Sequence, residues 1–406
     1  MINILIIDLN YTNFGSANIA ILHRLFSGQD HVNVTVLTEN INSIPEEMVE
    51  GFRIIRKAIH SKRSGSAVSL HNAGVYPRLL QAKQYMKKKQ DDVDYKRVED
   101  FLYHIEKLID ISEYDLLFSC SSPFESHVCA GRLAEKYHKK WIAYYMDPFS
   151  TDSDYPDAHF SNRVRTEEEI LQKCDAVLLT NPYMDDYLKH GIKLDLKRAF
   201  SVCLPGIRPI VKTEDICWND RGNVKRSVFI GNFYWSFRDP MNVINCYREL
   251  GEPYHLYFIG GVGGDDREKI LQEKGLNNIP NVHFMAPVAK EKAEQYMLSA
   301  DVLVNIGNTV DNLIPSKVFD YLSSGRPVIN FYKRDNCTST AFFRHYPNAG
   351  NFDDRCISPS EVKEFLDKTA EMPSLPYDRI REVFPDYSVE SVRNAVFSVI
   401  ETVLEM

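Results

Sequence analysis

Short apolar runs alternate with longer helical patterns along most of the chain. In the first half, the apolar runs predict buried strands over 4–9, 32–37, 116–119, 141–145 and 176–179. The helical patterns predict helices over 17–26, 78–111, 124–137 and 161–173. Gly, Pro, Asp, Ser or Asn bounds each predicted strand, as the turns between strands and helices require. This alternation is typical of a parallel sheet with helices on both faces.

The same alternation restarts after residue 223. Predicted strands cover 227–230, 256–259, 282–284, 302–306 and 327–331, and predicted helices cover 240–250, 265–274, 289–299 and 316–323. A last helix over 389–404 places five valines on one face, namely Val389, Val392, Val396, Val399 and Val403. The segment 204–223 begins LPGIRPIVK and then turns polar, which is typical of an interdomain linker.

Two such series predict an α/β protein of two Rossmann-like domains that face a central cleft. We expect an amino-terminal domain over 1–205, a second domain over 206–386 and a closing helix over 387–406 that packs back toward the first domain. The 406 residues suit two domains, and 44% hydrophobic residues give each a core. Because the carboxyl ends of both sheets would line the cleft, it is the expected ligand site.

The net charge, the cysteine spacing and the amino-terminal sequence argue against several classes of protein. The net charge of −8 argues against a nucleic-acid binder, which usually carries a basic excess. The eight cysteines have no CxxC or zinc-type spacing, so we expect buried, reduced thiols in a cytoplasmic protein. The start MINILIIDLN lacks the charged leader and cleavage site of a signal peptide. No apolar run of about 18 residues predicts a membrane span.

The predicted helix over 78–111 has two different parts. Its downstream part carries an apolar stripe made of Val98, Phe101, Leu102, Ile105, Leu108 and Ile109. Its upstream part is basic through Arg78, Lys83, Lys87, Lys88 and Lys89. Such a basic stretch is either a solvated helix face or a peripheral contact with anionic lipid headgroups at the inner face of a membrane.

The segment 315–330, PSKVFDYLSSGRPVIN, contains the best-defined candidate site. Pro315 and Ser316 predict a helix start, with the Ser316 side chain capping a free backbone N–H. The helix N-terminus and Lys317 suit an anionic phosphate. Asp320 shares a helical face with Lys317, where its carboxylate can accept hydrogen bonds from both hydroxyls of a ribose. Gly325 is expected to end the helix.

The run SADVLVNIGNTVDNLIPSKVFDYLSSGRPVINF over 299–331 resembles the donor-nucleotide motif of GT-B-fold glycosyltransferases, in particular the family 4-like enzymes. Other pieces that match in character and order are WIAYYMDPF, CDAVLLTN, LPGIRP, VFIGNFYWSFRDP, HLYFIGG and NVHFMAPVAKEKAEQYMLSADV. The resemblance spans most of the chain and is strongest over 228–331. It implies a GT-B fold and a nucleoside-diphosphate sugar as donor.

The resemblance also assigns roles to single residues of the donor site. Asp320 matches the second acid of the family's Glu-x7-Glu motif, which is expected to hold the donor ribose. Lys317 and Arg238 match positions expected to neutralise the diphosphate leaving group. The first acid of the motif would fall at Asn312, with Asp311 beside it. This departure leaves the stereochemical outcome open.

Glycines complete the expected donor site. Gly231 lies at the turn where the backbone must approach the donor, and Gly15 and Ser16 lie in the matching amino-terminal loop. The glycine-rich turn over 260–264 favours a donor-side loop over a dinucleotide site, because it is not a GxGxxG at a helix start. Cationic side chains can stabilise the leaving diphosphate without a metal or cofactor. The Asp-Ser-Asp at 152–154 is therefore not favoured as a metal site.

On the acceptor side, Asp147 is the candidate general base. It follows a predicted strand and precedes Pro148, and its carboxylate could take a proton from an incoming hydroxyl. A turn or capping aspartate is the alternative. His127 is a weaker candidate, because a lone helical histidine is more often structural.

The resemblance implies a hexosyltransferase that uses a nucleotide sugar and a glycan or lipid-linked acceptor, as in surface polysaccharide assembly. A nucleotide-sugar 2-epimerase of the same fold is the second interpretation. A non-catalytic relative that binds a nucleotide or a sugar is the third.

Overall fold

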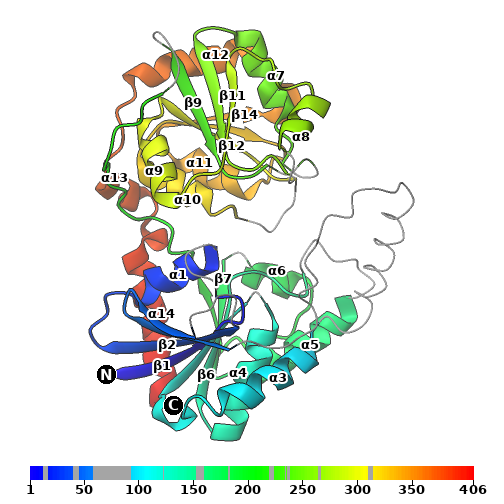
Figure 1. Ribbon diagram of the computed structural model, residues 1–406, viewed down its shortest axis with the longest axis vertical. Coiled ribbons are helices and arrows are strands. Elements are labelled where there is room, and N and C mark those ends of the chain that lie inside the picture. The colour runs from blue at the N-terminus through cyan, green and yellow to red at the C-terminus, as the bar shows by residue number, and fades with distance from the viewer. Residues whose placement is uncertain are drawn as a thin grey trace. The chain divides into compact units, whose positions relative to one another are not determined.

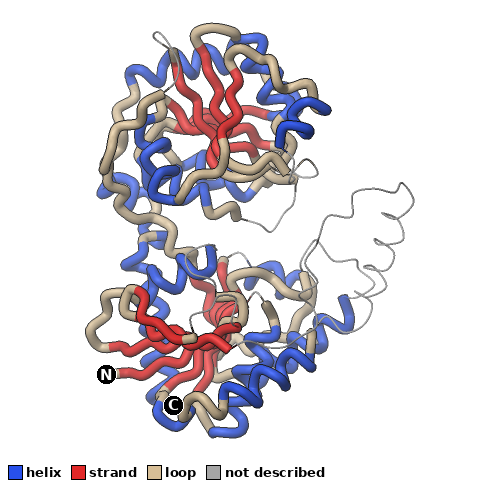
Figure 2. Tube along the Cα trace, viewed as in Figure 1, coloured by secondary structure: helices blue, strands red, loops and turns tan. Residues whose placement is uncertain are grey.

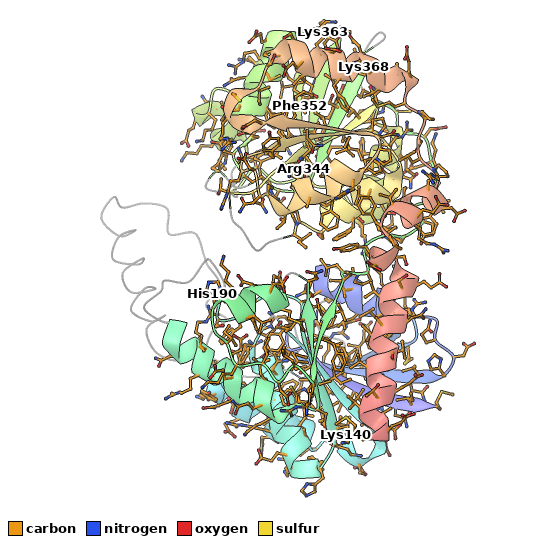
Figure 3. All side chains as sticks on the ribbon, turned by 180° about the vertical axis from the view of Figure 1, so that it is seen from behind. Lys140, His190, Arg344, Phe352, Lys363 and Lys368 are labelled. Atoms are coloured by element: carbon orange, nitrogen blue, oxygen red, sulfur yellow. The ribbon has the colours of Figure 1, made fainter. Side chains whose placement is uncertain are left out.

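The computed structural model describes residues 1–11, 17–39, 45–57, 93–121, 123–151, 160–181, 183–218, 224–233, 235, 238–263, 267–309 and 314–406. The chain divides into two compact units. The first unit comprises Met1–Leu204 with Glu390–Met406, and the second comprises Pro205–Val389. Figures 1 and 2 show the helices and strands of each unit, and Figure 3 adds the side chains. Among the described helices, none is long and apolar enough to cross a membrane.

The first unit is a mostly parallel sheet with helices against it (Figure 1). Its described strands run in the order β3-β4-β2-β1-β5-β6-β7-β8, and the β3–β4 pair is antiparallel. These strands are β1 (Ile2–Ile7), β2 (Val32–Glu39), β3 (Glu46–Val49), β4 (Phe52–Lys57), β5 (Leu116–Ser121), β6 (Lys140–Tyr145), β7 (Ala176–Thr180) and β8 (Ala199–Val202). The helices are α1 (Ala17–Phe26), α3 (Tyr95–Ile105), α4 (Glu125–Tyr137), α5 (Phe160–Lys173), α6 (Tyr183–Lys189) and α14 (Val389–Glu405), with a 3-10 turn at Ile111–Glu113.

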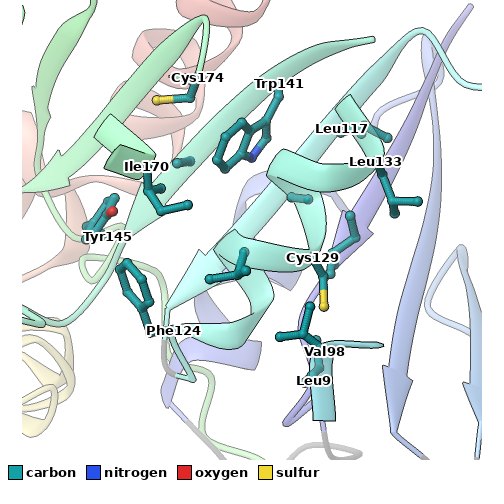
Figure 4. Packing of buried hydrophobic residues seen from close by; sticks show 14 of the residues in the cluster. Leu9, Val98, Leu117, Phe124, Cys129, Leu133, Trp141, Tyr145, Ile170 and Cys174 are labelled. Carbon is teal, nitrogen blue, oxygen red and sulfur yellow. The ribbon is translucent and has the colours of Figure 1, made fainter. Parts of the chain in front are cut away.

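Each face of this sheet has its own apolar core. Alternate residues of β1 face opposite ways, so Ile4 packs in one core and Leu5 in the other. The core around Ile4 includes the valines of α14 that the sequence placed on one face, apart from Val389. In the core around Leu5, Trp141 lies against α4 (Figure 4), where a side chain on Gly131 would come within 3.0 Å of its ring.

The second unit is a fully parallel sheet with the strand order β11-β10-β9-β12-β13-β14. This is the doubly wound Rossmann order, in which the chain changes direction across the sheet between β9 and β12. The strands are β9 (Lys225–Ile230), β10 (Tyr254–Ile259), β11 (Val282–Met285), β12 (Val302–Ile306), β13 (Val328–Tyr332) and β14 (Ala349–Asp353). The helices are α7 (Met241–Leu250), α8 (Arg267–Glu273), α9 (Lys290–Ser299), α10 (Lys317–Ser324), α11 (Thr338–His345), α12 (Pro359–Lys368) and α13 (Tyr377–Val383), with 3-10 turns at Asp354–Cys356, Thr369–Glu371 and Pro385–Tyr387.

A row of three asparagines, two of them fully buried, crosses three strands of the second sheet. Asn305, Asn330 and Asn351 are register partners on β12, β13 and β14. The Asn305 amide donates to Asn330 at 2.7 Å, and the Asn330 amide donates to Asn351 at 2.8 Å. A one-residue slip would leave these buried groups without partners, so the row fixes the register near the end of β12.

The predicted two α/β units with parallel sheets are confirmed, and every predicted strand lies within one residue or two of an observed one. The sequence missed β3, β4, β8 and β14, and it missed α6, α11, α12 and α13. Of these strands, β3, β8 and β14 have four or five residues and lie at the edges of their sheets. Strand β4 lies inside the first sheet, but two arginines and a lysine interrupt its apolar residues.

Three finer predictions need correction. The predicted linker begins where the two units divide, but its described part is packed, because Trp218 lies against Tyr257 and Tyr296 of the second unit. The helix predicted to reach residue 111 ends at Ile105, and Leu108 is exposed. The eight cysteines are all free thiols, but those at 217 and 356 are exposed rather than buried. The basic stretch 78–89 lies outside the described residues.

Candidate functional site

Helix α10 begins at the carboxyl end of the second sheet, close to the point where the strand order reverses. The Tyr321 hydroxyl, one turn into the helix, accepts the backbone N–H of Ile230 at 2.8 Å and ties α10 to the end of β9. The helix ends at Gly325 in the left-handed conformation (φ 72°), as predicted. A side chain at Gly325 would lie 2.2 Å from the Leu375 carbonyl oxygen, so no other residue fits there.

The prediction that the Ser316 side chain caps this helix is wrong. Ser316 precedes the helix with helical backbone angles (φ −55°), and its side chain makes no capping hydrogen bond. A capping side chain needs an extended backbone at this position, which Ser316 lacks. The exposed Ser316 therefore leaves the first backbone N–H groups of α10 without a side-chain cap.

Lys317, the first residue of α10, has a buried amine. Its Nζ lies 3.7 Å from the centroid of the Phe229 ring, and within the described residues it has no hydrogen-bond partner. Burial, and then the positive charge of Arg238, lower the pKa of Lys317 well below its ordinary value. A buried ammonium beside a second cation is unfavourable unless an anion compensates it. The position therefore suits an anionic ligand.

Arg238 and Asn308 supply further donors beside this amine. Arg238 is 7% exposed, and the Nε of its guanidinium donates to the Asn308 side-chain oxygen at 2.8 Å. Its Nη1 donates to the Asn232 carbonyl oxygen at 3.4 Å. The Asn308 amide nitrogen is buried and, within the described part of the chain, makes no hydrogen bond. Asn308 follows β12 and is not among the site residues predicted from the sequence.

Asp320 lies one turn further along α10 and pairs with Arg208. Its Oδ1 is 3.4 Å from Nη2 of Arg208, and the same guanidinium contacts the Glu294 carboxylate on α9. All three side chains are partly exposed, with 18–25% of each accessible. The LPGIRP motif pointed to this segment, but nothing in the sequence showed that Arg208 would reach α10.

The turns after β9 and β10 pack closely against each other. Gly231 adopts a φ of 118°, which favours glycine. A side chain on Gly260 would lie 2.1 Å from the Gly231 carbonyl oxygen. The Gly261 N–H donates to the Asn232 side chain at 2.8 Å. These contacts explain the glycines of both turns, and the role of Gly231 in approaching a donor stays a prediction.

Several predicted site residues lie outside the described residues. They are Gly15, Ser16, Asp311 and Asn312, together with the Asp-Ser-Asp at 152–154. Among the residues that are described, no group of three His, Cys, Asp or Glu side chains is arranged to hold a metal ion.

In the first unit, Asp147 follows β6 at the carboxyl end of the sheet. Its Oδ2 accepts the Asn18 amide at 3.1 Å, and its carbonyl oxygen accepts the Ser121 hydroxyl at 3.3 Å. The Asn18 amide also donates to the Ser121 carbonyl oxygen at 3.3 Å. Asn18 on α1 therefore links the ends of β5 and β6 around the candidate base, a role that the sequence did not indicate.

His127 is a core histidine. It is fully buried, and its Nδ1 lies 2.7 Å from the Ser119 hydroxyl. Its ring stacks on Tyr145 with the centroids 4.4 Å apart. Burial lowers the pKa of His127 to about 3, so the ring is neutral at ordinary pH. A side chain with no exposed surface does not reach a substrate in this structure, which removes the geometric basis for a catalytic role.

Asp8 is a titratable group that the sequence did not single out. It follows β1 within the apolar run ILIIDLN and is 3% exposed. Burial raises the pKa of Asp8 to about 7, against the lowering effects of the Asn10 N–H at 3.0 Å and of Arg97. At neutral pH this carboxyl is therefore partly protonated.

No family model matches the sequence, and no curated protein matches it. Solved structures do match over the full length. Sucrose-phosphate synthase from Thermosynechococcus elongatus aligns with a TM-score of 0.70 at 14% identity, covering 100% of both chains. The Anabaena protein HepE, in complex with UDP and glucose, aligns at 0.62 with 10% identity, covering 99% of this chain and 100% of the other.

A third structure extends the same result. The UDP-forming α,α-trehalose-phosphate synthase from Burkholderia xenovorans, in complex with glucose-6-phosphate, aligns with a TM-score of 0.60 at 11% identity. The alignment covers 98% of this chain and 99% of that enzyme. The predicted GT-B fold is therefore confirmed, and these similarities speak for the fold alone.

Proposed function

We propose that this protein is a glycosyltransferase that moves a sugar from a nucleoside-diphosphate donor to a glycan or lipid-linked acceptor, in surface polysaccharide assembly. The observation that carries the proposal is the buried Lys317 amine, which lies against Phe229 without a hydrogen-bond partner among the described residues. A diphosphate would supply the missing negative charge. The site lies where a doubly wound sheet binds its ligands.

The chemistry of transfer fits these side chains. Breaking a sugar–phosphate bond builds negative charge on the departing diphosphate, and donors placed in advance stabilise that charge. Lys317, Arg238 and the Asn308 amide are such donors. Asp320 would then hold the ribose, with its charge balanced by Arg208. In the first unit, Asp147 would take the proton of the acceptor hydroxyl.

The first test is UDP binding to the Lys317→Met variant. UDP is the starting probe because one of the structures with this fold is a complex with UDP and glucose. Losing the charge-assisted contact should raise the Kd for UDP about 100-fold. Without ligand, the variant should be more stable by about 1–3 kcal/mol, because a buried charge is gone. Titration calorimetry and thermal unfolding measure the two effects.

The matched control is Lys269→Met, an exposed lysine on α8 of the same unit. It should leave both the Kd and the melting temperature unchanged. UDP binding to Lys317→Met as tight as to the wild type would contradict the assignment of the site. If the wild-type protein binds none of UDP, GDP and dTDP, or binds only CMP, the proposed donor class is wrong.

A second experiment separates transfer from epimerisation. Labelled nucleotide sugars are incubated with the protein alone and with candidate lipid-linked or glycan acceptors. We expect the label to enter an acceptor, with release of the nucleoside diphosphate. Conversion of the nucleotide sugar to its 2-epimer without any acceptor would replace the proposal with the epimerase interpretation.

A further inference from the structure

The turn that follows β6 is held by unusually many contacts for a loop. Phe149, two residues after Asp147, stacks on Phe124 with the ring centroids 3.8 Å apart and the planes at 13°. The Arg163 guanidinium lies 4.1 Å from the centroid of the same Phe149 ring. An aromatic ring bounded by a second ring and a cation is worth more than its buried area alone. The turn is thus packed from α4 and from α5.

Hydrogen bonds from the same turn end on one buried carboxylate. Glu167 on α5 is fully buried and accepts both the N–H of Ser150, at 3.3 Å, and the Ser150 hydroxyl. Its other oxygen accepts the Tyr187 hydroxyl at 2.5 Å, and that hydroxyl in turn accepts the Phe149 N–H at 3.3 Å. Two consecutive residues of the turn are therefore tied to the Glu167–Tyr187 pair.

Burying the Glu167 carboxylate lowers the stability of the fold, so we ask what the carboxylate contributes in return. Burial raises the pKa of Glu167 to about 7, although the hydrogen bonds from Ser150 and Tyr187 oppose the shift. An apolar side chain would fill the same space without that penalty. What the carboxylate adds is direction, because its two oxygens fix Ser150 and, through Tyr187, Phe149. Asp147 itself is held from the other end by Asn18.

We infer that Glu167 and Tyr187 are positioning residues, which fix the turn so that the Asp147 carboxylate stands ready to receive the acceptor proton. The inference rests on the proposed function. A general base works only within hydrogen-bond reach of the proton it takes, and small displacements lower the rate steeply. Apolar packing alone would stabilise the fold without the hydrogen bonds that tie Phe149 and Ser150 to Tyr187 and Glu167.

The test is Tyr187→Phe, which deletes one hydroxyl and keeps the ring. We expect kcat for sugar transfer to fall about 10-fold, because the pair loses two hydrogen bonds, with the Kd for UDP unchanged. In the Asp147→Asn background, the same substitution should change the residual rate less than about two-fold. Glu167→Gln is the second variant and should behave in the same way.

The matched control is Tyr346→Phe, a buried tyrosine of the second unit whose hydroxyl donates to the Arg326 carbonyl oxygen at 2.9 Å. It should leave kcat unchanged while altering stability to a similar extent. An equal fall in rate with and without Asp147, or no fall at all, would overturn the inference. A wild-type protein that neither binds UDP nor transfers sugar would instead refute the proposed function.

Discussion

The two units place opposite charges at the carboxyl ends of similar parallel sheets. The first unit has carboxyl groups there, Asp8 after β1 and Asp147 after β6. The second has Lys317 at the start of α10 and Arg238 beside the loop after β12. In each unit burial disfavours the charged form of one of these groups, Asp8 in the first and Lys317 in the second. The pKa of Asp8 therefore rises, while the pKa of Lys317 falls.

Under the proposed function, one architecture serves two halves of a reaction. A sheet end with carboxyl groups suits an incoming hydroxyl that must lose its proton, and a cationic one suits a departing diphosphate. Exposed charges elsewhere on the surface do not distinguish the two sheet ends. Lys363 and Lys368 on α12 (Figure 3) pair with Asp367 and Glu364 one turn away, and such exposed pairs contribute little. The two sheet ends differ in the charged side chains that are buried or held by hydrogen bonds, not in the exposed ones.

The largest effect is expected from Asp147→Asn, which tests the acidic end. As an amide cannot take a proton, kcat for transfer should fall about 10²- to 10⁴-fold, with folding and the Kd for UDP unchanged. Steady-state rates, UDP titration and thermal unfolding measure the three quantities. Asp185→Asn, at an exposed position of α6, is the control and should be fully active. Substantial turnover by Asp147→Asn would remove it from the role of base.

The second largest effect is expected on the pH dependence of the free energy of unfolding, and it arises from the buried Asp8. Its pKa is raised from the ordinary 3.8 to about 7, so the folded state keeps a proton that the unfolded state releases. Stability from this group is therefore full below pH 4 and is lost as the pH rises toward 7. The loss amounts to at most about 4 kcal/mol at 1.36 kcal/mol per pKa unit.

Asp8→Asn should remove this part of the pH dependence, since its side-chain oxygen can still accept the Asn10 N–H. Urea unfolding at pH 5 and pH 8 measures it for the variant and the wild type. Glu167 contributes a change of the same sign, so some decline should remain. Asp30→Asn, at an exposed position, should leave the wild-type decline unaltered. The same decline in Asp8→Asn would show that Asp8 does not bind the proton.

The sequence predicted the helix at 317–324 well because its start and stop signals are local. Pro315 precedes it, and only glycine fits its end at Gly325. The alternation of strands and helices likewise predicted both parallel sheets. Strand β14 escaped prediction because its sequence, AGNFD, has no apolar run.

The electrostatics of the site could not be predicted in this way. The amine of Lys317 is buried against Phe229, which lies on another element far along the chain. The Arg208–Asp320 pair likewise joins residues 112 positions apart. Asp8 was hidden inside an apolar run. In each case the pKa or the pairing depends on tertiary contacts that no local pattern encodes.

The smallest effect tests the cationic end and is a proton taken up on binding. Burial and the charge of Arg238 lower the pKa of Lys317 in the free protein, and a bound diphosphate should raise this pKa again. UDP binding should therefore be coupled to proton uptake at any pH where the free amine is partly neutral. Calorimetry in two buffers of different ionisation enthalpy measures this coupling. Uridine, which lacks the diphosphate, should bind without uptake. Identical UDP enthalpies in both buffers would show that Lys317 is already charged before UDP binds. The two sheet ends would then still carry different side chains, but burial would not change the protonation of the cationic one.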